Sequence, residues 1–253
     1  MMLTEKQIED YHKNGFVVPE YRIPGKMLDD IREMSKRLVH EYKEFRDYCP
    51  TLLAYETGFL TVARHPQILD MVEQILGPNF ALWNSSFFSK PANNGKATPW
   101  HQDGEYWPIR PMATCTAWLA IDTATEENGC LEYIPGSHTA KKALSHETNP
   151  SDEYTLNQEL LSSEFDQSKA YSLELEAGQM ALHDAFIVHG SGVNNSSNSR
   201  RGMTLRYMPT TSVFDRELAA EMASTTSLGH QERTLFLMRG IDACGKNDFR
   251  VRL

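Results

Sequence analysis

The sequence predicts a mainly β, α+β fold, in which a jelly roll of short strands is supported by a buttress of helices. Two observations predict it. Apolar residues recur at helical spacing in the first third of the chain. From about residue 80, short runs of β-branched and aromatic residues alternate with turn signals such as Asn128-Gly129 and Pro135-Gly136. Helices that precede many short strands favour a sheet sandwich or a jelly roll.

Three helices are expected before residue 78. The first follows Thr4, because Thr4 and Gln7 have the spacing of a capping box. The second follows Pro24, where apolar residues recur every three or four positions. The third runs from Pro66 to Gly77, with proline at the first helical position and glycine just past the end.

The strands are expected at residues 80–90, 114–122, 130–134, 171–176, 179–183 and 201–208. Residues 138–170 are polar and acidic, and they read either as an inert surface loop or as a lid over the mouth of a barrel. We expect a single domain over residues 1–253, with a helical part at about 1–78, a jelly-roll core at about 79–210 and a C-terminal extension at 211–253.

Composition excludes several classes of protein. The 253 residues are 40% hydrophobic, which suits one domain with a sizeable core. With 34 acidic and 25 basic residues, the net charge of -9 argues against a nucleic-acid partner or an anionic membrane surface. No apolar run has the length of a membrane span, and the N-terminus lacks the pattern of a signal peptide. Four widely spaced cysteines without a C-x-x-C motif read as free thiols in a cytoplasmic protein. No feature determines an oligomeric state.

The chemistry is predicted first by His101-Gln102-Asp103. On an extended segment, residues two apart face the same side, so His101 and Asp103 would direct an imidazole and a carboxylate into one space. A second histidine on a neighbouring strand would complete a 2-His-1-carboxylate set, which suits non-haem Fe(II). His230-Gln231-Glu232 has the same H-x-[DE] spacing, but it is discounted because we expect that charged segment to be helical.

Residues 188–194 read Val-His-Gly-Ser-Gly-Val-Asn, and Arg200 follows eleven positions after His189. H-x-D, a long gap, H-G-S-G-x-N and this arginine together resemble the phytanoyl-CoA dioxygenase family of Fe(II)- and 2-oxoglutarate-dependent oxygenases. The resemblance extends to Lys90-Pro91, to Trp118 and to residues 128–138. It covers nearly the whole chain apart from the acidic insertion and the last twenty-odd residues. It implies a cupin-like double-stranded β-helix.

The resemblance implies roles for single residues. His101, Asp103 and His189 match the iron ligands of the family. Arg200 matches the residue that pairs with the distal carboxylate of 2-oxoglutarate, a role that suits the planar fork of a guanidinium. Ser191 matches the hydroxyl donor to the same carboxylate.

Further positions line the expected pocket. Trp118 matches a family position beside the cosubstrate, and Asn84 is a further expected contact to it. Arg201 is a rival for the role of Arg200, although the spacing favours Arg200. Strand alternation then turns Arg206 inward as well, where it could grip an anionic group of the substrate.

The resemblance implies Fe(II) and 2-oxoglutarate as cofactors, O2 as cosubstrate, and hydroxylation through a ferryl intermediate. The intact Asp103 argues against halogenation, for which related enzymes carry a small residue there. The expected substrate-facing residues are Glu105, Tyr106, Trp107, Arg110 and Arg206, although residues 105–110 read equally as a solvated loop. Such a lining suits a small polar molecule: an amino acid derivative, a compatible solute, an aminophosphonate or a natural-product intermediate.

Three alternatives stay open. The same cofactors could drive desaturation, epoxidation or ring closure. The chain could be a non-catalytic sensor that binds iron and 2-oxoglutarate. The triad could also hold zinc for hydrolysis, although the arginine and the H-G-S-G pattern would then have no purpose.

Overall fold

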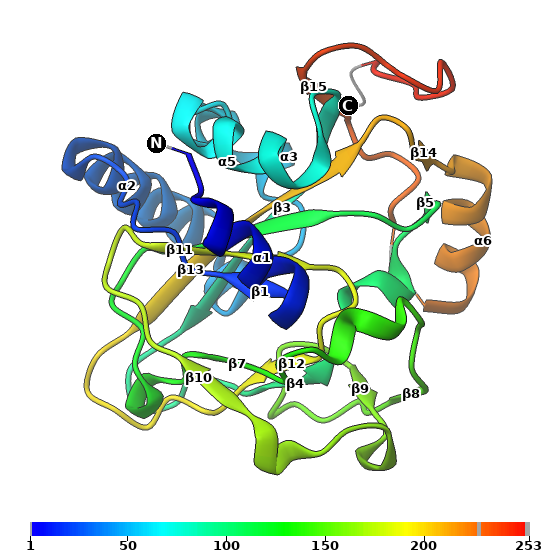
Figure 1. The fold of residues 1–253 in the computed structure, drawn as a ribbon. Coiled ribbons are helices and arrows are strands. Elements are labelled where there is room, and N and C mark those ends of the chain that lie inside the picture. The colour runs from blue at the N-terminus through cyan, green and yellow to red at the C-terminus, as the bar shows by residue number, and fades with distance from the viewer. Residues whose placement is uncertain (1, 227–228, 251–253) are drawn as a thin grey trace.

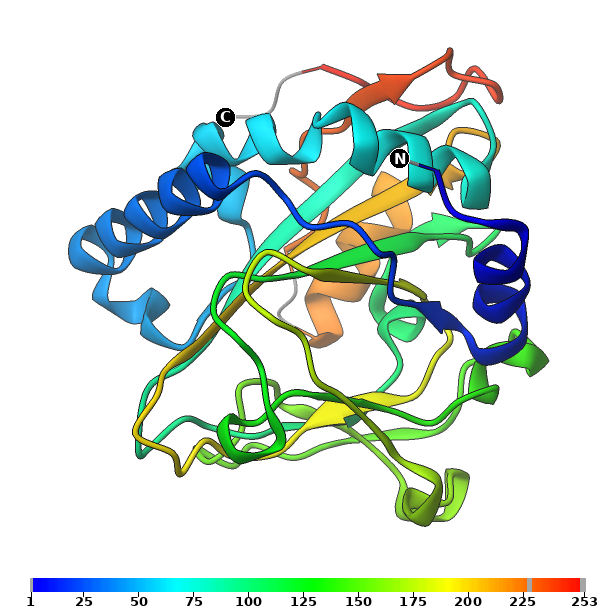
Figure 2. The same cartoon turned by 60° about the vertical axis from the view of Figure 1, so that its left-hand side comes forward.

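The structure, a computed structural model, describes residues 2–226 and 229–250; the side chains at positions 105, 106 and 224–226 lie outside this description. Figures 1 and 2 show a layer of helices over a large sheet, with a smaller sheet facing the opposite side of that sheet. The expected jelly roll with a helical buttress is confirmed. None of the helices in the described part of the chain has the length and apolarity needed to cross a bilayer.

The helical layer follows the predicted starts and stops. Helix α1 (Glu5–Asn14) begins at the Thr4 capping box, in which both reciprocal hydrogen bonds form. Helix α2 (Gly25–Glu41) follows Pro24. Helix α5 (Pro66–Leu76) ends before Gly77, whose φ of 84° suits glycine. The short helices α3 (Leu52–Tyr55) and α4 (Leu60–Ala63) were not expected, because four residues are too few for a periodic apolar pattern.

The larger sheet has the strand order β1-β11-β6-β13-β3-β15, with β2 also paired to β3. Its strands are β1 (Phe16–Val17), β2 (Tyr48–Cys49), β3 (Phe80–Lys90), β6 (Cys115–Ala120), β11 (Met180–Asp184), β13 (Arg200–Pro209) and β15 (Phe236–Arg239). Strand β3 has the predicted bounds. The long β3–β13 pair runs from Arg200 opposite Lys90 to Pro209 opposite Phe80 and supports the site described below.

The two faces of the larger sheet bury different side chains. Leu82, Ala117, Leu182, Met203 and Leu205 turn towards the helices and join the largest hydrophobic cluster. The alternate residues turn towards the smaller sheet, where a second cluster fills part of the space between the sheets. The rest of that interior face carries polar residues, which is the first structural sign of a functional cavity.

The smaller sheet has the order β10-β7-β12-β4, formed by β10 (Tyr171–Leu173), β7 (Leu131–Tyr133), β12 (His189–Ser191) and β4 (Thr98–His101). The acidic insertion contains the hairpin of β8 (His146–Thr148) and β9 (Gln158–Leu160). In the insertion, the Thr155 hydroxyl hydrogen-bonds to the hydroxyl of Thr98, which fixes the insertion beside β4.

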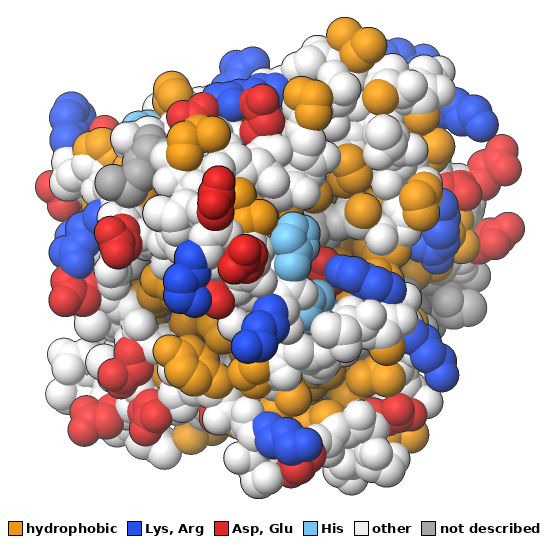
Figure 3. Space-filling model, in the orientation of Figure 1, with side chains coloured by type: hydrophobic (Ala, Val, Ile, Leu, Met, Phe, Trp, Pro, Cys, Tyr) orange, Lys and Arg blue, Asp and Glu red, His pale blue; other side chains and the backbone are white. Residues whose placement is uncertain are grey.

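The C-terminal extension wraps one edge of the molecule. Strand β14 (Val213–Phe214) pairs with β5 (Ile109–Arg110), and helix α6 (Arg216–Thr226) follows. Residues 229–235 form no helix, so the prediction that the segment around His230 is helical is wrong. The chain instead crosses to β15, which pairs with β3. Figure 3 shows acidic, basic and hydrophobic side chains interspersed over one face of the molecule.

Candidate active site

Three potential metal ligands meet where β4 and β12 pair. His189 lies directly opposite His101 in this pair, and their ring centroids are 4.1 Å apart. Strand β4 ends at His101, and Asp103 opens the short 3-10 turn of residues 103–106. The Asp103 carboxylate lies 3.7 Å from His101 Nε2. One potential ligand atom from each of the three residues lies within 4.8 Å of the others, and all three side chains are buried.

The hydrogen bonds of both histidines leave one nitrogen free for a metal. His101 Nδ1 contacts the Pro99 carbonyl at 2.8 Å, and His189 Nδ1 contacts the Ile187 carbonyl at 3.0 Å. Because a carbonyl only accepts, each Nδ1 carries the proton and each Nε2 keeps its lone pair. Burial lowers the pKa of both imidazoles, which favours the neutral form that binds metal.

The charge of Asp103 is also suited to a cation. Burial would raise the pKa of Asp103, but Arg206, the nearby His183 and the two triad histidines outweigh it and hold the pKa below its usual range. The buried Oδ2 atom has no hydrogen-bond partner in the described structure. An ionised carboxylate with an unsatisfied buried oxygen fits a divalent metal.

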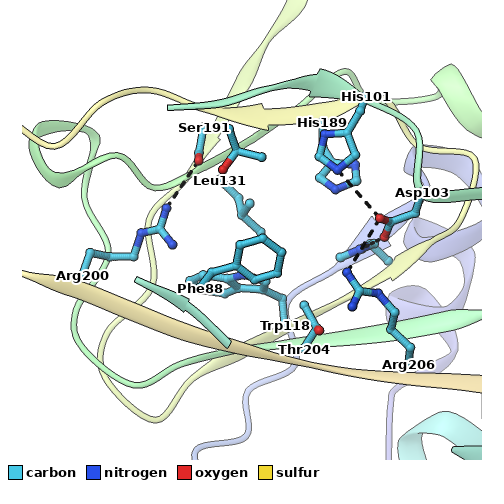
Figure 4. Close-up of a pocket in the computed structure, with 12 residues that line it drawn as sticks. Phe88, His101, Asp103, Trp118, Leu131, His189, Ser191, Arg200, Thr204 and Arg206 are labelled. Carbon is cyan, nitrogen blue, oxygen red and sulfur yellow. Dashed lines mark hydrogen bonds and ion pairs between the residues drawn. The ribbon is translucent and has the colours of Figure 1, made fainter. Parts of the chain in front are cut away.

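A cavity of about 30 Å³ leads from this triad to Arg200. Figure 4 shows Arg200 and Ser191 at one end and the triad at the other, with Phe88, Trp118 and Leu131 between them. Arg200 is 2% exposed, and no carboxylate lies within ion-pair distance of it in the described structure. Its Nε and Nη2 donate to the Gly129 carbonyl at 3.1 and 2.6 Å, and Nη2 lies 3.4 Å from the Ser191 hydroxyl.

Arg201 points the opposite way. Its guanidinium pairs with Asp122 at 2.7 Å and also donates to Ser35. Strand alternation on β13 therefore places Arg200, Thr204 and Arg206 together in the cavity and turns Arg201 away from it.

Trp118 forms the floor beneath Arg200, whose guanidinium carbon lies 5.5 Å from the ring centroid. The neighbouring strand makes room for the indole at Gly202, where an added Cβ would lie 2.3 Å from the ring. A glycine at this position is therefore a packing requirement of the cavity.

Arg206 joins the metal end of the cavity to a second space. Its Nη2 lies 3.8 Å from Asp103, its Nη1 donates to Ser86 at 2.7 Å, and its guanidinium lies over Trp107. Asn84, expected beside the cosubstrate, instead accepts a hydrogen bond from Arg233 at 3.0 Å and lies on this Arg206 side.

Of the other tentative substrate residues, Arg110 is the one whose side chain the structure describes, and it lines neither this cavity nor the Arg206 side. Arg110 is exposed and donates to the carbonyls of Trp107 and Ile109. The side chains of Glu105 and Tyr106 lie outside the described residues.

Sequence reasoning missed two pairs of residues. His183 Nε2 lies 3.6 Å from Asp103, and its Nδ1 hydrogen-bonds to the Tyr133 hydroxyl at 2.8 Å. His230 and Arg233 reach the Arg206 side from the C-terminal extension. Strand alternation could have placed His183 on the inner face of β11, but the sequence carries no signal for the path of residues 229–235.

Comparison with known proteins agrees with this geometry. Residues 11–202 match the family described as phytanoyl-CoA dioxygenase (PhyH). The chain is 32% identical to the peroxisomal phytanoyl-CoA dioxygenase of Bos taurus, over 81% of this chain and 68% of the bovine protein.

Two solved structures share the fold. The apo structure of the non-heme monooxygenase ThoJ has a TM-score of 0.75 and 24% identity, covering 97% of this chain and 88% of the other. The epimerase SnoN, in complex with Fe3+, alpha ketoglutarate and nogalamycin RO, has a TM-score of 0.71 and 20% identity, covering 86% and 88%. The chain belongs to the phytanoyl-CoA dioxygenase family and is a 2-oxoglutarate-dependent non-haem iron dioxygenase.

Proposed function

We propose that this enzyme, acting as a single oxygenase domain, hydroxylates a small polar molecule. His101, Asp103 and His189 hold iron, while Arg200 and Ser191 bind the distal carboxylate of 2-oxoglutarate. The observation that carries the proposal is the cavity itself. It joins a triad ready for a metal to a buried arginine without a carboxylate partner in the described structure. A dicarboxylate that chelates the metal at one end would place its far carboxylate beside Arg200.

The chain's own residues position and shield the reactants. Bound iron supplies O2 activation and oxidation of a substrate C–H bond, with 2-oxoglutarate as the co-reductant. The neutral imidazoles and the ionised Asp103 hold the metal without a proton to displace. The apolar walls formed by Phe88, Trp118 and Leu131 exclude water from the chelate.

Arg206 and Trp107 support a polar or charged substrate on the other side of the triad. An amino acid derivative, an aminophosphonate or a natural-product intermediate fits this setting. Product analysis separates hydroxylation from desaturation, epoxidation or ring closure. The relative named above is peroxisomal, and a cytoplasmic location of this chain stays a prediction.

The test is an anaerobic titration with Fe(II) and 2-oxoglutarate, followed through the weak visible charge-transfer band of the chelate. Wild type is expected to form the band, His189→Ala to abolish it, and Arg200→Ala to weaken the affinity for 2-oxoglutarate. Slow succinate release in air without an added substrate separates an enzyme from an inactive sensor. If wild type forms no band but binds zinc tightly, a hydrolytic or structural metal site is the better assignment.

A further inference from the structure

A second cavity, of about 90 Å³, opens on the Arg206 side of the triad. It shares His101, Asp103 and Arg206 with the cosubstrate cavity, so a molecule bound in it would lie beside the metal site. His230 and Arg233 add further walls. Both come from the C-terminal extension and lie outside the residues 11–202 that match the family. The C-terminal extension thus reaches the substrate side of the triad.

The hydrogen bonds of His230 determine which of its nitrogens can donate to a ligand. Arg233 Nε donates to His230 Nδ1 at 3.4 Å, so the neutral imidazole carries its proton on Nε2. Burial, together with the charges of Arg233 and Arg206, lowers the pKa of His230 to about 3, so the ring is neutral at pH 7. His230 is only 5% exposed, and Nε2 has no hydrogen-bond partner in the described structure.

The arginines add further donors. Arg206 is buried, and its Nε also lacks a hydrogen-bond partner among the described atoms. Arg233 donates from Nη1 to the Pro50 carbonyl and to the Asn84 side chain, and these two contacts orient its fork. Buried donors without acceptors are costly, so the site is built for a ligand that supplies acceptors.

The charge around this cavity is strongly positive. Within the described residues, no carboxylate lies within 4.0 Å of Arg233, and the one such partner of Arg206 is Asp103 at 3.8 Å. In the proposed function, Asp103 is a ligand of a divalent metal, so its negative charge is compensated by the metal and does not neutralise the arginines. Two guanidiniums and the metal then face one small space, which favours an anion over a neutral or cationic group.

We propose that Arg233, Arg206 and His230 bind an oxyanion group, a carboxylate or a phosphonate, of the prime substrate. The proposal rests on the proposed function, because it places this anion beside the metal and directs the rest of the substrate to it. It assigns substrate selection to the C-terminal extension. The substrate class is therefore a small molecule with an anionic end, as in an amino acid derivative or an aminophosphonate.

Propionate, ethylphosphonate and neutral propionamide are suitable probes. Each is titrated anaerobically into the enzyme loaded with Fe(II) and 2-oxoglutarate, and binding is followed by the chelate band and by thermal stabilisation. At least one anion should bind saturably to wild type, whereas propionamide should not. The tighter anion identifies the preferred head group.

Arg233→Met should weaken binding of that anion by about 10- to 100-fold, the effect of losing a charged hydrogen-bond partner. Arg233→Lys should recover part of the affinity. Arg239→Met is the matched control, because Arg239 belongs to the same extension but pairs with Asp70 and Glu73 on α5. It should bind the probes as wild type does. His230→Asn provides a second test if Arg233→Met does not fold.

The outcomes separate the two proposals. Three results would overturn the anion site while leaving the proposed function intact, provided that wild type forms a normal chelate band. They are no response to either anion, equal binding of propionamide, and unchanged anion affinity in both Arg233→Met and His230→Asn. If wild type forms no chelate band, the proposed function is contradicted. Thermal stabilisation then still reports whether the anion binds.

Discussion

Replacing Gly202 by alanine should damage cosubstrate binding although it adds only one methyl group. The backbone of Gly202 is not in the left-handed region, so alanine is tolerated by the strand itself. The new Cβ would lie 2.3 Å from the Trp118 ring, whereas ordinary contact begins at 3.4 Å, so about 1.1 Å (3.4 − 2.3) must be gained by movement of the indole. Trp118 is buried against Arg200 and cannot move without disturbing it.

Overpacking of this kind costs about 1–3 kcal/mol. If all of it appears in the affinity for 2-oxoglutarate, the dissociation constant rises about 5- to 150-fold. The assay is the anaerobic chelate titration, with Fe(II) binding measured separately and expected to be unchanged. Gly192→Ala is the matched control in the same region, because nothing lies within 4 Å of its added Cβ. Wild-type affinity in Gly202→Ala, or an equal loss in Gly192→Ala, would refute the reasoning.

Three further predictions follow from the geometry. Arg200→Lys should weaken 2-oxoglutarate binding about tenfold or more, because a lysine cannot form the bidentate contact. Arg201→Lys should lower only the unfolding free energy. If the chelate titration shows the larger loss of 2-oxoglutarate affinity in Arg201→Lys, Arg201 is the anchor. Tyr133→Phe removes the 2.8 Å hydrogen bond to His183 and should weaken Fe(II) binding about tenfold through the position of the triad carboxylate; unchanged Fe(II) affinity would deny this pair a positioning role. Burial and two neighbouring arginines lower the pKa of His230 to about 3 in the folded protein. As the pH falls below about 6.5, the unfolded chain therefore protonates this imidazole while the folded chain does not. About 2 kcal/mol of the free energy of unfolding should be lost by pH 5. Urea unfolding of the metal-free protein at pH 7.5 and pH 5 checks this. In His230→Gln, the loss of unfolding free energy between these two pH values should be smaller by about 2 kcal/mol.

Several features were determined by residues close together in the sequence. The Thr4 capping box, the Pro66 start and the Gly77 end of α5 are local arrangements, and the structure has them where the sequence predicts them. The same holds for the bounds of β3, since a run of eleven suitable residues between turn signals leaves little freedom. The triad of His101, Asp103 and His189 was also predicted, but from its resemblance to a known family and not from local contacts, since His189 meets His101 only through the pairing of β4 and β12.

Only the tertiary structure decided which side chains share a space. Alternation along β13 left two possible faces, and packing against Asp122 on one side and Trp118 on the other chose Arg200 for the cavity. Residues 229–235 carry only the H-x-[DE] spacing that was discounted as a metal site, yet they bring His230 and Arg233 beside the triad. Periodicity and capping report contacts within a few residues, whereas these neighbours are far apart along the chain and meet only through the packing of whole sheets and of the extension that crosses them.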